Sequence, residues 1–359
     1  MPTSSKKVTS KKGLSKQSAL KARASAPFVS IKNAIGDLKA RRPHRSFQLT
    51  RRRDYVRELE LPGYIAFTHY VNKTLWGFRK LFIPLTVVYI LLYAILVGVG
   101  SQDTYSTLSG TLQEATDEVF QGDLGAVGQA GVLFLTIVSS STSVEATEAQ
   151  QIFSVFIFVL IWLTTVWLLR NVLAGHRVKL RDGFYNSGGP IFATVVLMLV
   201  IAVQLLPAAA AVIGYTAAEA SGLIAGGGAP AMLFWIGAAL LVLLSLYWIT
   251  SSLFAMIIVT LPGMYPLRAL KTSGDMVLGR RTRILLRWLW MALMISLTWA
   301  LVIIPFILID MGLKSLWPAI EWVPIVPTAI VVMSAISTVW VSSYVYLLYR
   351  KVVDNERES

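Results

Sequence analysis

The chain has 359 residues, of which 55% are hydrophobic and only 14% are charged, and its formal net charge is +14. A mean hydropathy of +0.63 lies well above the range of soluble globular proteins. This composition excludes a soluble globular domain and predicts an integral membrane protein.

Residues 1–60 are predicted to form a disordered, basic, cytosolic tail. Residues 1–80 carry 19 Lys and Arg and four acids, and the first 45 have few large apolar side chains. No apolar core of a cleavable signal peptide follows the basic start, so the first span is expected to serve as an uncleaved signal anchor. An organelle transit peptide stays open as the alternative. Aromatic side chains are too sparse there to form stacking platforms for nucleic acid, which favours contact with lipid or non-specific polyanions.

Residues 61–80 predict an amphipathic helix that lies on the membrane surface. Tyr64, Phe67, Val71, Leu75 and Phe78 share one helical face. Near the membrane end lie Lys73, Trp76, Arg79 and Lys80, as expected for anchoring by aromatics and cations.

Six apolar runs then reach or approach the roughly 20 residues that a helix needs to cross about 30 Å of hydrocarbon. They are Leu81–Gly100, Ile152–Leu169, Pro190–Val212, Ala231–Leu261, Trp288–Ile309 and Val323–Leu348. A backbone in lipid must satisfy its own hydrogen bonds, so these runs predict helices and not strands. The predicted fold is an all-α, polytopic bundle of six transmembrane helices over residues 81–349, with a cytosolic tail over 350–359.

The segment Leu124–Ser141 is apolar but short. It is predicted to lie on the outer leaflet, to dip into it, or to pack over the bundle. A seventh span is the alternative, but it would move a basic loop or the basic C-terminal tail to the outside.

The distribution of cations predicts the orientation. The segment before Leu81 holds 19 of the 33 Lys and Arg, and the loops after the second, fourth and sixth spans hold four, six and three. The loops after the first and third spans hold none, and Lys314 follows the fifth span. With both termini in the cytoplasm, 32 cations lie inside and one lies outside, which is the positive-inside pattern.

The loop between the fourth and fifth spans predicts a short amphipathic helix. Pro266 suits its first residue, Gly279 suits its end, and Thr282 is expected to cap the helix that follows. The loop between the second and third spans has a related layout, with cations, a Gly-rich turn and Pro190 as the first residue of the next helix. Both loops lead into spans that a proline is expected to break near the outer end, at Pro207 and Pro305, so the layout hints at a duplicated hairpin.

The stretch YPLRALKTSGDMVLGRRTRILLRWLW carries a proline, an Ala-Leu pair, a serine and a Gly-Arg before the fifth span. These positions are Pro266, Ala269, Leu270, Ser273, Gly279, Arg280 and Arg283. Over about 25 residues the stretch resembles the cytosolic segment of bacterial six-span proteins, including the membrane domain attached to glycerophosphodiester phosphodiesterases. The resemblance implies a protein of the cytoplasmic membrane with a poorly defined role, and it implies no activity.

Chemical motifs are sparse. The chain has no cysteine, and His44, His69 and His176 lack the spacing of metal ligands. The spans contain almost no ionisable residue, which counts against proton-coupled and ion-coupled transport. Gln204 is the lone amide of the third span, and small hydroxyl residues of the fourth and sixth spans predict close helix packing rather than a polar pore. The sequence therefore predicts no enzyme, no cofactor and no metal site.

The favoured interpretation is a non-enzymatic protein of a bacterial or archaeal plasma membrane, whose basic cytosolic face contacts anionic lipid or a partner. The partner is a membrane protein or a second copy of the chain, and nucleic acid is disfavoured. The alternative is a permease-like transport component for a lipidic or uncharged substrate. The candidate contact residues are Arg177, Lys179, Arg181, Arg268, Lys271, Arg280, Arg281 and Arg283.

Overall fold

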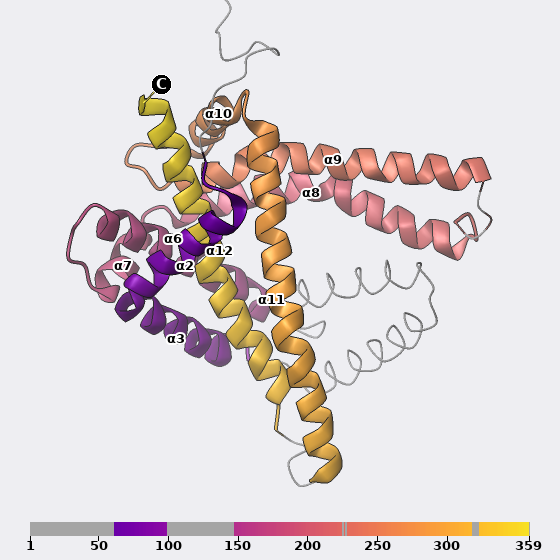
Figure 1. The fold of residues 1–359 in the computed structure, drawn as a ribbon, viewed down its shortest axis with the longest axis horizontal. Coiled ribbons are helices and arrows are strands. Elements are labelled where there is room, and N and C mark those ends of the chain that lie inside the picture. The colour runs from indigo at the N-terminus through magenta and orange to yellow at the C-terminus, as the bar shows by residue number, and fades with distance from the viewer. Residues whose placement is uncertain (1–60, 99–146, 225, 227, 318–322, 359) are drawn as a thin grey trace, which may run out of the picture. The chain divides into compact units, whose positions relative to one another are not determined.

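The computed structural model describes residues 61–98, 147–224, 226, 228–317 and 323–358. Over these residues the regular structure is entirely helical (Figure 1). The helices are α2 (Tyr64–Gly77), α3 (Arg79–Leu96), α6 (Glu148–Leu173), α7 (Leu180–Ser187), α8 (Ile191–Ala220), α9 (Gly228–Ile258), α10 (Pro266–Val277), α11 (Arg281–Leu316) and α12 (Ile325–Glu358). The predicted basic tail and the segment Leu124–Ser141 lie outside the described residues.

Six of these helices are long and apolar enough to cross a membrane: α3, α6, α8, α9, α11 and α12. Each covers most of one predicted apolar run, so the all-α fold with six spans is confirmed. Several helices extend past those runs. Helix α11 has 36 residues, and at a rise of 1.5 Å per residue it is about 54 Å long. Because the hydrocarbon layer is only about 30 Å thick, α11 continues beyond it.

Two arginines join helix ends that are far apart in the sequence. Arg170, near the end of α6, donates through Nη1 to the carbonyl oxygen of Thr260, just after α9, at 3.1 Å. Arg280, immediately before α11, donates through Nη1 to the carbonyl oxygen of Val352, near the end of α12, at 3.4 Å. Arg170 also forms a hydrogen bond with the Tyr346 side chain of α12. The ends of α6, α9 and α12 and the start of α11 therefore meet at one end of the bundle, which we call the basic end.

Helix α2 docks at the basic end. Phe67 and Val71, two of the residues predicted to share its apolar face, are fully buried. The Phe67 ring meets the Tyr344 ring of α12 edge to face, with centroids 4.9 Å apart. Arg287 of α11 donates to the carbonyl oxygen of Pro62, which fixes the chain just before α2. A break at Phe78 separates α2 from α3.

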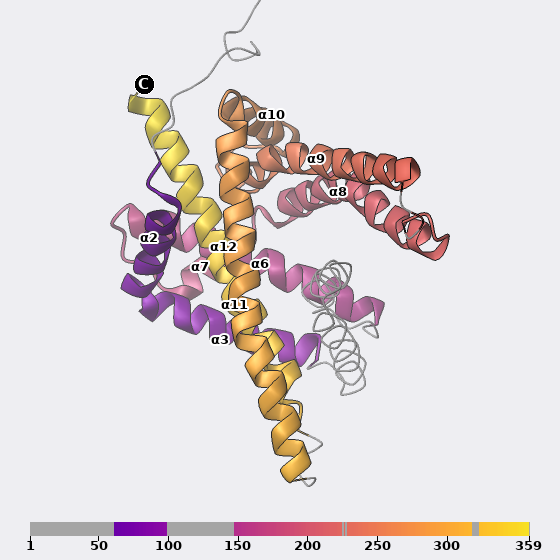
Figure 2. The ribbon, with the colours of Figure 1, turned by 45° about the vertical axis from the view of Figure 1, so that its right-hand side comes forward.

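Aromatic rings form the centre of the main core near the basic end. Phe254 of α9 lies edge to face with Trp288 of α11, at a centroid distance of 5.2 Å. The centroid of the Trp288 ring lies 6.5 Å from that of the Tyr344 ring of α12, so three spans meet around these rings. By contrast, only 11% of the most apolar window of α8 and 6% of that of α9 is buried within the protein. These two helices pair with each other along their lengths (Figures 1 and 2) and present apolar surface suited to lipid.

The prolines do not break their helices as predicted, because Pro207 lies inside α8 and Pro305 lies inside α11. A proline within a helix removes one N–H donor and displaces the preceding turn, but a neighbouring hydroxyl can satisfy the backbone groups that are freed. Here the backbone N–H of Ala208 donates to the Oγ of Ser245 on α9 at 3.0 Å. The continuous helix therefore depends on its partner helix.

The local signals at the loops were partly correct. Pro266 is the first residue of α10, as predicted. Gly279 follows α10 with a φ of +77°, a left-handed conformation that favours glycine. The predicted cap at Thr282 was wrong, because α11 begins at Arg281 and Arg280 occupies the capping position without a side-chain cap. Pro190 precedes α8 by one position instead of being its first residue.

Candidate functional site

The connecting helices α7 and α10 share one mode of packing. In α7, Gly183 and Ser187 are buried, and α7 packs on the preceding span α6. A Cβ atom at Gly183 would lie 3.0 Å from the Thr164 side chain and 3.2 Å from that of Leu168, so the close approach favours glycine. In α10, Ala269 and Ser273 are buried at the same spacing, and α10 packs on its preceding span α9. This shared spacing strengthens the hint of a duplicated hairpin.

With small residues facing the bundle, the opposite faces of these helices and their flanking loops present cations. Six of the eight candidate contact residues are exposed: Arg177, Lys179, Arg181, Arg268, Lys271 and Arg283. We call these six residues the basic surface. Two acids, Asp182 of α7 and Asp275 of α10, lie on the same helices. The Asp182 carboxylate accepts from the backbone N–H of Lys179 at 3.1 Å. The Asp182 carboxylate therefore stabilises the first turn of α7.

Arg280 and Arg281 do not belong to the basic surface. Only 2% of Arg280 is exposed, and its guanidinium reaches inward to the end of α12. Arg281 is half-buried, with its guanidinium 3.8 Å from the centre of the Tyr247 ring on α9. A lipid headgroup cannot reach a buried guanidinium, so direct lipid contact does not fit Arg280. Both residues instead join the start of α11 to other helices.

Lys314, the one cation that the charge pattern predicts to lie outside, has an acidic partner one helical turn away. The Nζ of Lys314 lies 2.9 Å from the Oδ2 of Asp310, and the Asp310 side chain is almost fully buried. An ion pair at this spacing within one helix reduces the net charge of that end of α11. Lys314 is therefore a weak exception to the one-sided distribution of cations.

Polar groups inside the spans join helices to one another. The Oγ of Ser252 on α9 donates to the Oε1 of Gln204 on α8 at 2.7 Å, and the indole N–H of Trp299 on α11 donates to the Oγ of Ser337 on α12 at 2.8 Å. These contacts agree with the prediction of close packing. Within the described ranges, no group of three or more His, Cys, Asp or Glu is placed to hold a metal ion.

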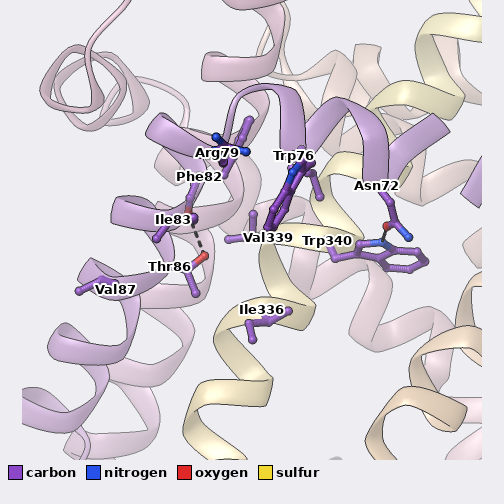
Figure 3. A pocket seen from close by; sticks show the side chains of 11 residues that line it. Asn72, Trp76, Arg79, Phe82, Ile83, Thr86, Val87, Ile336, Val339 and Trp340 are labelled. Carbon is purple, nitrogen blue, oxygen red and sulfur yellow. Dashed lines mark hydrogen bonds between the residues drawn. The ribbon is translucent and has the colours of Figure 1, made fainter. Parts of the chain in front are cut away.

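An open groove of about 420 Å³ lies where α2, α3 and α12 meet (Figure 3). Asn72, Leu75 and Trp76 line it from α2, and Ile336, Val339 and Trp340 line it from α12. The α3 side is formed by Arg79, Phe82, Ile83, Thr86 and Val87. Its polar side chains are Asn72 of α2, Arg79 at the start of α3 and Thr86 further along α3, whose hydroxyl donates to the Phe82 carbonyl of the same helix. Most of the remaining lining is apolar. The cavity has the size of a small-molecule site, typically about 300–1,000 Å³.

The sequence indicated only part of this groove. Trp76 and Arg79 were expected near the membrane interface because they end an amphipathic segment. The contribution of α12 was not expected, because Trp340 lies more than 250 positions away from that segment. The indole N–H of Trp340 donates to the Oδ1 of Asn72 at 2.8 Å, and this contact closes one side of the groove.

Comparison of the chain with family models, with curated proteins and with solved structures found no match.

Proposed function

We propose that this chain is a multi-pass protein of a bacterial or archaeal plasma membrane whose basic end faces the cytosol and binds anionic lipid headgroups through the basic surface. The observation that supports this proposal is the exposure of six cations on and beside the two connecting helices, α7 and α10. In the proposed role the protein is not an enzyme. Its weak resemblance to bacterial six-span membrane proteins agrees with this location.

Electrostatics support an anionic partner. A cation close to an anionic membrane surface gains roughly 1 kcal/mol, and the attraction decays within one Debye length. Because α7 and α10 each pack against a span, their cations are held near the ends of those spans. Several cations distributed over two surface helices match a lipid surface, whose negative charge is spread over many headgroups. A protein partner with an acidic face, including a second copy of the chain, would use the same charges.

Neutralising the basic surface is expected to weaken binding of an anionic lipid. We expect the combined variant Lys179→Gln, Arg181→Gln, Arg268→Gln and Lys271→Gln to bind dioctanoyl-phosphatidylglycerol about tenfold more weakly than the parent at low salt. Fluorescence titration of the purified protein in a neutral detergent measures this difference. The difference should shrink as salt is raised, and binding of dioctanoyl-phosphatidylcholine should not change. Equal binding of the anionic lipid by parent and variant at every salt concentration would show that these cations only set the orientation.

The orientation itself can be tested by labelling, because the chain has no cysteine of its own. Asn186 of α7 and Ser221, just after α8, are both exposed and are expected on opposite sides of the membrane. In intact cells, a membrane-impermeant maleimide should label Ser221→Cys but not Asn186→Cys. After the cells are lysed, both variants should react. External labelling of Asn186→Cys would contradict the cytosolic location of the basic end.

A further inference from the structure

The groove between α2, α3 and α12 is separate from the basic surface, and its chemistry changes along its length. Arg79 is the first residue of α3, and Ile83 and Val87 follow four and eight positions later. At a helical rise of 1.5 Å per residue, these two side chains start about 6 and 12 Å further along α3. The groove therefore begins at a cation and continues along apolar side chains in the direction of the span.

The polar end of the groove offers donors. The Arg79 guanidinium lies 5.4 Å from the centre of the Trp76 ring, which holds the cation beside the groove. The Oδ1 of Asn72 accepts from the Trp340 indole, which leaves the amide NH2 group of Asn72 as a donor. A guanidinium and an amide NH2 are both suited to phosphate oxygens.

The charge around this end selects the sign of the ligand. Residues 61–98 contain three cations, Lys73, Arg79 and Lys80, and no Asp or Glu. All three cations are exposed. A ligand whose polar part is anionic is therefore favoured at the end of the groove that Arg79 forms.

The apolar part of the groove remains open. Ile83 is 53% exposed, Val87 is 47% exposed and Ile336 of α12 is 46% exposed, so these side chains leave a surface that the described helices do not cover. The two tryptophans, Trp76 and Trp340, lie close to the polar end, and tryptophan is enriched at the level of lipid headgroups. An occupant must then be polar at the height of the tryptophans and apolar below them.

From these features we propose that the groove is a discrete binding site for one anionic glycerophospholipid. The headgroup phosphate binds Arg79, the Asn72 amide offers a further donor on the other side of Trp76, and one acyl chain lies along Ile83, Val87 and Ile336. The site is independent of the basic surface, since it lies on other helices and depends on the shape of the groove as well as on charge.

Native mass spectrometry of the full chain in a neutral detergent tests the proposal. The protein is titrated with palmitoyl-oleoyl-phosphatidylglycerol and, separately, with palmitoyl-oleoyl-phosphatidylcholine. We expect the protein to bind one lipid molecule tightly, and to bind phosphatidylglycerol about tenfold more tightly than phosphatidylcholine. A tenfold difference in affinity is about the contribution of one charge-assisted hydrogen bond. Arg79→Gln should remove this preference. The matched control Lys80→Gln changes an exposed cation that does not line the groove, and it should keep the preference.

A second variant tests the apolar part. Ile83→Trp fills the groove from an exposed position and should weaken binding of both lipids, while circular dichroism shows that the helices remain. The variant with four glutamines in the basic surface should still retain the single lipid, which separates this site from the proposed function. Equal preference in Arg79→Gln and the parent would overturn the proposal. An equal loss in Lys80→Gln would also overturn it, because a diffuse positive field would then explain the binding.

Discussion

Replacing Phe67 by alanine is expected to release α2 from the bundle, at a cost of about 3 kcal/mol in the free energy of docking. The Phe67 side chain is fully buried, and its ring packs edge to face on Tyr344. A Phe→Ala change in a core loses both the transfer free energy of the ring and the contacts of the cavity walls. The Arg287 guanidinium, which lies 5.7 Å from the same ring, would lose part of its aromatic surroundings as well.

Hydrogen exchange followed by mass spectrometry measures this effect on α2 directly. Amides of α2 should exchange at least tenfold faster in Phe67→Ala than in the parent, because docking limits their opening. Ile65→Ala is the matched control, since it removes a large apolar side chain from the same helix at a position that is 75% exposed. Its α2 amides should exchange as in the parent. Unchanged exchange in Phe67→Ala would mean that α2 is held at the membrane by lipid and not by α12.

The number and type of the spans were predictable because hydropathy is a local property. Any run of about 20 apolar residues must become a helix if it enters a membrane. The boundaries were less predictable, since α11 continues as a helix through Asp310 and Lys314 where hydropathy falls. Helix propensity and an ion pair within the helix maintain it there, and a hydropathy profile does not detect either effect.

The division of the basic loop into exposed and buried cations was not predictable. Arg280 and Arg283 lie three positions apart and are chemically identical, yet one is buried and the other is exposed. The difference comes from Val352, whose carbonyl oxygen is brought to Arg280 by the packing of α12. A contact between residues 72 positions apart leaves no local trace in the sequence. The groove has the same origin, because its two sides come from opposite ends of the described chain.

The role of proline in α8 shows how a local signal can be detected and yet misinterpreted. Pro207 was correctly identified as a feature of the third span, but its effect depends on Ser245 of the neighbouring helix. A proline kink in lipid leaves backbone groups that need partners, and a hydroxyl on another helix can supply one. The side chain of Ser245 is buried beside this turn and accepts from the Ala208 N–H.

Ser245→Ala is therefore expected to lower the free energy of unfolding by about 1–2 kcal/mol, because the Ala208 N–H loses its acceptor in apolar surroundings. Ser251→Ala is the matched control on the same helix. The Ser251 hydroxyl donates to the Trp248 carbonyl of its own helix at 3.1 Å, so its loss should cost less than about 0.5 kcal/mol. Equilibrium unfolding in sodium dodecyl sulfate measures both values.

A double-mutant cycle with Pro207→Ala then tests the cause. Alanine at position 207 restores the missing N–H donor and lets α8 straighten, so the Ala208 N–H can bond within its own helix to the Gln204 carbonyl. In that background Ser245→Ala should cost close to nothing, which gives a coupling free energy of about 1 kcal/mol between positions 207 and 245. If Ser245→Ala costs the same with proline or alanine at position 207, the serine stabilises α8 and α9 by packing alone. The proline and the serine form a single structural unit only if the cost depends on the proline.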